Sequence, residues 1–189
     1  MCLPSDFLQQ SAPEYSAEER FQLLTIARQT IDAALHNKEL TLLAPSEHLA
    51  ENRAAFTTLH LEGHLRGCVG YVVPEHPLYR TVAETAFAAA FYDRRFVPVG
   101  VEEASRLALQ ISVLSPVQPI SPEDVEVGQH GLIVSVGQQR GLLLPQVPIE
   151  QGWDRLTFLE QTCRKAGLSP DAWRNGAKLE AFTAEVFSE

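Results

Sequence analysis

The chain has 189 residues, which is the length of one domain whose core needs no metal or disulfide to support it. A formal net charge of −9 argues against binding to nucleic acid, because phosphate backbones attract basic surfaces. The three cysteines form no C-x-x-C pair, so neither a disulfide framework nor a cysteine zinc site is indicated, and a reducing, cytoplasmic location is expected.

The beginning of the chain shows no targeting or membrane signal. Residues 1–15 lack the basic and apolar regions of a signal peptide, and no apolar run approaches the roughly 20 residues that span a bilayer. We therefore expect a flexible N-terminal tail over residues 1–15, a single domain over residues 16–189, and no membrane association.

The first predicted elements are a helix and a hairpin. Ser16 and Glu19 have the spacing of a capping box, and apolar residues then recur at helical intervals to Asn37. Two strand-like stretches, 54–61 and 64–73, flank the dipeptide Glu62-Gly63, which suits a tight β-turn.

The later predicted elements are again helices and strands. In chain order we expect an alanine-rich helix over 77–93, a strand over 106–115, a hairpin over 131–145, a helix from Asp154 to Gly167, and a final strand over 178–187. Helices and antiparallel hairpins without a βαβ rhythm indicate an α+β fold with a mostly antiparallel sheet.

The first hairpin carries the residues most suited to chemistry. With Glu62 and Gly63 at the turn, strict pairing places Leu59 opposite Arg66 and Thr57 opposite Cys68. Alternation along the strand then divides the side chains into two faces. Phe56, Leu65, Val69 and Tyr71 are expected to face the core, and His64, Arg66 and Cys68 to form a row on the other side.

Cys68 is the candidate nucleophile of this row. Arg66, about 7 Å away along the strand, is close enough to lower the pKa of the thiol, whereas His64 is about 13 Å away and is a poor base for it. Gly67 and Gly70 bracket Cys68, as glycines do at a bulge or where a ligand or another backbone approaches.

Structural alternatives remain open for these residues. Cysteine is among the residues most often buried, so Cys68 could be plain core packing, and Arg66 could be an ion-pair partner of Asp93 or of a glutamate. Asp93 and Arg95 follow a helix end, where they either terminate the helix or form an anion clamp. No metal site is expected, because strand alternation removes the helical face that His60, His64 and Cys68 would need.

Several ordered segments together resemble the AMMECR-type domain family. The segment Leu65-Arg66-Gly67-Cys68-Val69-Gly70 is similar to the family's L-R-G-C-I-G hallmark, and Asp93-x-Arg95-Phe96 follows it in the family's order. Later segments agree over the rest of the chain, from about residue 16 to the end. They are Gln110-Ile111-Ser112-Val113-Leu114, Gly141-Leu142-Leu143-Leu144-Pro145-Gln146-Val147, Trp153 and Cys163-x-Lys165-Ala166-Gly167-Leu168.

The resemblance implies a fold more than a function. It implies an α+β domain with a mostly antiparallel central sheet, flanking helices and no established activity. It also implies a modification system shared with Memo-like and radical-SAM partners. Arg94 stands where the family commonly has proline, which makes the turn that presents Asp93 and Arg95 the least conforming part of the pattern.

Two functions follow as hypotheses. The first is a binding or adaptor component that takes a small-molecule or peptide ligand in a groove around Arg66 and Cys68 and also forms a homodimer. The second is a thiol-dependent enzyme with Cys68 as nucleophile. The sequence does not decide whether the protein is an enzyme, and it indicates no cofactor. The expected site has Cys68 and Arg66 as catalytic residues and His64, Gly67, Gly70, Asp93 and Arg95 as ligand-binding residues.

Overall fold

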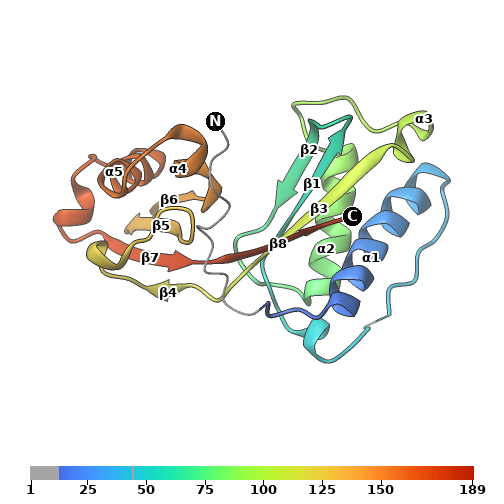
Figure 1. The fold of residues 1–189 in the computed structure, drawn as a ribbon, viewed down its shortest axis with the longest axis horizontal. Coiled ribbons are helices and arrows are strands. Elements are labelled where there is room, and N and C mark those ends of the chain that lie inside the picture. The colour runs from blue at the N-terminus through green and yellow to red at the C-terminus, as the bar shows by residue number, and fades with distance from the viewer. Residues whose placement is uncertain (1–12, 44) are drawn as a thin grey trace, which may run out of the picture.

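The structure is a computed structural model that describes residues 13–43 and 45–189. In this part of the chain, the main strands form two four-stranded antiparallel sheets, in the orders β2-β1-β3-β8 and β4-β7-β5-β6 (Figure 1). The expectation of an α+β fold with antiparallel strands is confirmed. The strands are shared between two sheets that lie side by side along the long axis of the molecule.

The first sheet takes strands from the N-terminal half, the middle and the C-terminal end of the chain. Its strands are β1 (Ala55–Leu61), β2 (His64–Gly70), β3 (Leu107–Leu114) and β8 (Ala184–Ser188), and its helices are α1 (Ala17–Leu35), α2 (Leu78–Phe91) and the short α3 (Val101–Ala104). Ser16 and Glu19 make the predicted capping box at the start of α1, where the Ser16 hydroxyl accepts the Glu19 N–H.

The second sheet is built from the C-terminal half. Its strands are β4 (Gln118–Pro119), β5 (Gly131–Val136), β6 (Gln139–Leu143) and β7 (Lys178–Phe182), with helices α4 (Gln146–Gln151) and α5 (Arg155–Lys165). Asp154 caps α5 as expected by accepting the Thr157 N–H. Single 3₁₀ turns cover His48–Ala50, Pro122–Asp124 and Ala172–Arg174.

The predicted final strand is two strands. Residues 178–182 pair with β5 in the second sheet, whereas residues 184–188 pair with β3 in the first. The break falls at Thr183, whose N–H donates to the Ser115 hydroxyl and whose carbonyl accepts the Ser115 N–H. The chain therefore crosses from one sheet to the other here, as the long red strand in Figure 1 shows.

Three apolar clusters hold these layers together. One lies between the first sheet and the helices α1 and α2, and a second lies between the second sheet and α5. The third joins the sheets, because Leu114 of β3 and Ala184 of β8 pack with Ile133 of β5 and Phe182 of β7. Apolar burial of this kind is the dominant stabilising contribution to a fold.

Ordered packing begins before α1. Tyr15 is only 1% exposed, stacks on the His48 ring, and has its pKa raised to about 12 mainly by burial. The remainder of the predicted tail, residues 1–12, lies outside the described residues. No helix in the described part of the chain combines the length and the apolar character needed to cross a membrane.

Candidate functional site

The candidate site lies on the strand β2, and its register differs from the expected one. The turn is at Glu62 and Gly63 as predicted, but Leu59 pairs with Gly67 and Thr58 pairs with Cys68. Arg66 is the extra residue of a β-bulge, so every later partner moves by one position. The predicted pairing of Leu59 with Arg66 and of Thr57 with Cys68 is wrong for this reason.

The bulge also redistributes the side chains between the two faces. Val69 pairs with the buried Thr57 and belongs to the helix side, whereas Phe56 and Leu65 belong to the opposite side. His64 pairs with Leu61 and is therefore separated from Cys68. The predicted row of His64, Arg66 and Cys68 does not form.

The face of the first sheet that α1 and α2 leave uncovered carries a different row. The odd-numbered residues of β1 and β3 are buried against the helices, so the even-numbered ones point the other way. Across the strands, Cys68 lies beside Thr58, and Thr58 lies beside Gln110. All three are partly exposed, and we call this surface the open face.

Two further residues on the open face lie close to Cys68 in the sheet. The Thr58 hydroxyl donates to the Cys68 sulfur at 3.4 Å. His60 is two positions along β1 from Thr58 and so is about 7 Å from Cys68 on the diagonal. His60, and not His64, is therefore the imidazole that shares a face with the thiol.

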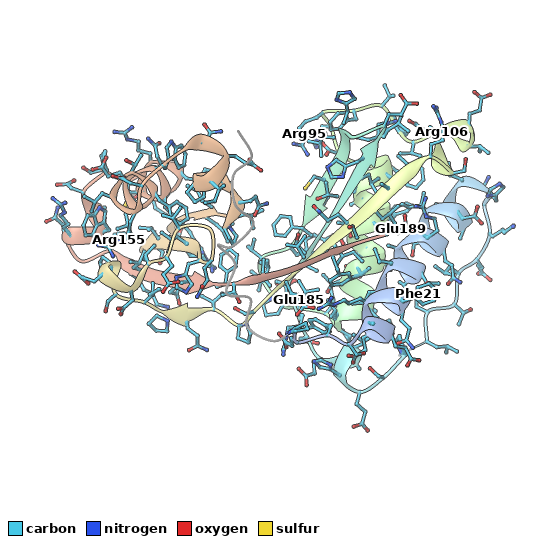
Figure 2. The ribbon with its side chains drawn as sticks, in the orientation of Figure 1. Phe21, Arg95, Arg106, Arg155, Glu185 and Glu189 are labelled. Atoms are coloured by element: carbon cyan, nitrogen blue, oxygen red, sulfur yellow. The ribbon has the colours of Figure 1, made fainter. Side chains whose placement is uncertain are left out.

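Asp93 and Arg95 hold the backbone of Cys68. The Cys68 N–H donates to Asp93 Oδ2 at 2.9 Å, and Arg95 Nη2 donates to the Cys68 carbonyl at 3.1 Å. Arg95 also binds Asp93 through Nε at 2.9 Å and Nη2 at 2.6 Å. We call these two residues the edge clamp. They satisfy outward backbone groups of β2, which ends the sheet order in the described part of the chain. Figure 2 labels Arg95 beside this edge.

The two residues of the edge clamp carry opposite charges, and each shifts the pKa of the other. The Asp93 side chain is 7% exposed, and the hydrogen bonds from Arg95 and from the Cys68 N–H hold the pKa of its carboxyl far below the usual range. The same pairing raises the pKa of Arg95. Asp93 is therefore a charged acceptor at neutral pH.

Arg66 is engaged in a second ion pair. Its Nε and Nη2 donate to the two carboxylate oxygens of Glu103 in α3 at 2.9 and 2.7 Å, which lowers the pKa of Glu103. The guanidinium also lies 5.9 Å from the centre of the Phe96 ring. Of the alternatives left open for Arg66, the ion pair with a glutamate is the one found, and it connects the bulge to α3.

Packing accounts for both glycines that flank Cys68. A Cβ at Gly67 would lie 2.2 Å from the carbonyl oxygen of Ala89, so α2 passes directly against β2 at this point. A Cβ at Gly70 would lie 2.2 Å from the Phe56 ring. The close neighbours are thus a helix backbone and an aromatic ring of the same protein.

Two cavities in the described part of the chain lie away from Cys68. One cavity, of about 510 Å³, lies between α1 and β8, and another, of about 200 Å³, lies between the two sheets near Ala54 and Ile133. Neither is lined by Arg66 or Cys68. Among residues 13–43 and 45–189, no group of three or more His, Cys, Asp or Glu side chains is placed to hold a metal ion.

The chain is similar to a known protein family, to other proteins and to a solved structure. The AMMECR1 family model matches residues 24–187. A protein of Aquifex aeolicus is 39% identical over 89% of this chain and 91% of its own length, and one of Methanothermobacter thermautotrophicus is 41% identical over 92% and 96%. The crystal structure of an uncharacterized protein from Pyrococcus horikoshii shares 40% identity and a TM-score of 0.78, over 88% of this chain and 89% of that one.

These matches run through both sheets and include the bulged strand, the edge clamp and the sheet-crossing strand within a single family model. The chain belongs to the AMMECR1 family.

Proposed function

We propose that this AMMECR1-family protein is a binding or adaptor component and that the open face around Cys68, Thr58 and Gln110 receives its ligand. The observation that carries the proposal is the engagement of the charged residues nearby. Asp93 and Arg95 are bound to the Cys68 backbone, and Arg66 is bound to Glu103. These groups stabilise the surface, whereas catalysis would need them free to move protons or bind substrate.

The open face suits a ligand with both polar and apolar parts. Cys68, Thr58, Gln110 and Ser112 supply weak or neutral hydrogen-bonding groups, and Leu65, with 43% of its surface exposed, supplies an apolar edge. A neutral surface of this kind selects a peptide segment or a small molecule by shape and hydrogen bonds more than by charge. Memo-like and radical-SAM proteins are the partner classes to test first.

The test is capture of these two partner classes by the immobilised, purified chain. Ala108→Lys places a long cation on the open face, because Ala108 is exposed and pairs with His60. Val136→Lys is the matched control, since Val136 is a 46%-exposed strand residue of the second sheet. We expect at least about tenfold weaker binding for Ala108→Lys and no change for Val136→Lys. Equal binding by both variants, or no binding by the wild type, would remove the proposal.

A thiol-dependent enzyme is the second candidate, and one observation favours it. The Thr58 hydroxyl donates to the Cys68 sulfur, and His60 shares the face, so a thiolate at Cys68 would have a donor and a base nearby. In a reconstituted system, Cys68→Ser should then abolish turnover while leaving partner capture intact. Full activity of Cys68→Ser would exclude this candidate.

A further inference from the structure

The two edges of the first sheet differ in how their backbone groups are satisfied. At the β2 edge, the edge clamp binds Cys68 from outside. At the β8 edge, Thr183 and Glu189 bond inward to β3, through the Ser115 N–H and the Leu109 carbonyl. Because inward and outward groups alternate along an antiparallel strand, Ala184, Val186 and Ser188 direct their N–H and C=O groups away from β3.

These outward groups face no other strand among the described residues, where β8 ends the sheet order. Val186, at the centre, has 51% of its surface exposed. An edge of this kind, without a bulge, proline or clamp, is a template for one more strand. Whatever binds it must present an extended backbone.

An apolar groove runs beside the same edge. Its volume is about 510 Å³, and its walls are α1, through residues such as Phe21 and Leu24, and β8, through Phe187 and Glu189. Phe21 is 70% exposed although it is a large aromatic residue on an otherwise well-packed helix (Figure 2). An exposed aromatic side chain next to an apolar groove is typical of a surface that binds a partner.

The charges around the groove are already paired. Arg20 binds Glu185 at 3.0 Å, and Arg28 binds both Glu189 and the carbonyl oxygens of Ala104 and Leu107. A charged peptide would therefore meet a locally neutral surface and gain little from its charge. A second surface of the same neutral kind would lose nothing by meeting it.

We propose that a second copy of this chain occupies this edge, with the two β8 strands antiparallel across a two-fold axis at Val186. In that register Val186 pairs with Val186 of the other copy, and Ala184 pairs with Ser188, so all the outward groups of β8 are hydrogen-bonded. The two sheets become one eight-stranded sheet. Both α1 helices lie on the same side of it, which brings Phe21 of each copy to the joined groove.

The proposed dimer also places its two open faces relative to each other. Because the strands are joined edge to edge, the two open faces lie on the same side of the continuous sheet. Seven strand-to-strand steps, about 34 Å across the sheet, separate the two β2 strands that carry Cys68. A dimer of this form presents two identical open faces on the same side of one sheet.

Sedimentation equilibrium of the full chain over a wide concentration range tests the proposal. Val186→Lys places two cations against each other on the axis, and Phe21→Glu places an anion at the groove. Both side chains are exposed, so both variants should fold. Val136→Lys is the control for surface charge. We expect a wild-type dimer, at least about tenfold weaker self-association for Val186→Lys and Phe21→Glu, and no change for the control.

Two further readouts distinguish this interface from another one. Dimerisation should strengthen with added salt, because each copy carries a formal net charge of −9 and salt screens the repulsion. The amides of Val186 and Ser188 should exchange more slowly at high protein concentration. A wild type that stays monomeric throughout, or a dimer that Val186→Lys leaves unchanged, would overturn the proposal.

Discussion

At the scale of single residues, the surroundings of Cys68 are explained by packing and backbone hydrogen bonding. Gly67 admits the α2 backbone, Asp93 and Arg95 bind both backbone groups of Cys68, and Arg66 binds Glu103. The Cys68 side chain is left partly exposed on the open face. These contacts therefore hold the Cys68 side chain in a fixed place on the open face.

Asp93→Ala should destabilise the protein by about 2 kcal/mol at neutral pH, because the part-buried Cys68 N–H loses its acceptor. The pKa of Asp93 is lower in the folded than in the unfolded protein, so its contribution is complete above the unfolded pKa near 4 and decreases as the pH falls toward the folded value. Urea unfolding of both proteins at neutral pH and at about pH 3 should show a smaller difference in acid. A difference that does not shrink would contradict the assignment.

Gly67→Ala should cost about 2 to 3 kcal/mol, because the added Cβ would lie 2.2 Å from the Ala89 carbonyl oxygen and α2 cannot yield easily. Gly100→Ala is the matched control, since nothing lies within 4 Å of its added Cβ and its φ of −98° suits any residue. Urea midpoints of the two variants check the prediction. Equal midpoints would show that α2 does not approach β2 in this way.

At the scale of elements, the sequence predicted most of the helices and strands but not the register of the key hairpin. Local signals were sufficient for α1, the Glu62-Gly63 turn and the start of α5. The glycines beside Cys68 are compatible with a bulge but do not say which residue is left unpaired, and the contact of Arg66 with Glu103 joins residues 37 positions apart in the chain. Counting from the turn therefore gave a wrong partner for Cys68 and selected His64 in place of His60.

The sheet crossing at Thr183 was missed for a similar reason. The segment from Lys178 to Phe187 is one continuous strand pattern, and only its partners β5 and β3 divide it between two sheets. Thr58 and Gln110 were also missed as site residues. Their proximity to Cys68 depends on β1 and β3 being neighbours, which a single strand's pattern does not reveal.

The ion pair that anchors the bulge should matter far more than an exposed one. Arg66→Ala should cost about 2 kcal/mol, since the side chains of Arg66 and Glu103 are only 12% and 18% exposed. Arg106→Ala removes a similar contact with Glu62, but those side chains are 54% and 70% exposed, and its cost should be below about 0.5 kcal/mol. Urea unfolding compares the two, and similar losses would mean that Arg66 does not anchor the bulge.

At the scale of the whole molecule, the two sheets are connected by the chain itself and by a common apolar cluster. The chain passes between them twice, from β3 to β4 and from β7 to β8 (Figure 1), and the apolar cluster around Ile133 and Phe182 is built from both. The cluster also covers one end of the open face, where Phe56 packs. The second sheet thus forms a boundary of the open face at the end where Phe56 lies.

The two sheets should therefore unfold together. Trp153 and Trp173 both pack on the core of the second sheet, so their fluorescence reports that part, whereas far-UV circular dichroism is dominated by α1 and α2. The two urea transitions should coincide, and Ile133→Ala should move both to lower urea by a loss of about 2 to 5 kcal/mol. Separate transitions would show two independently folding parts.

The exposure of Cys68 is the property on which the proposed binding surface depends most directly. The decisive measurement is alkylation of the native protein, with the modified cysteines located by peptide mass spectrometry, with and without a captured partner. Cys68 is partly exposed and should react in the folded state, whereas Cys163 is 0% exposed and should react only on unfolding. A bound partner should then protect Cys68. If Cys68 stays unreactive until the protein unfolds, or reacts equally with the partner bound, the open face is not the binding surface.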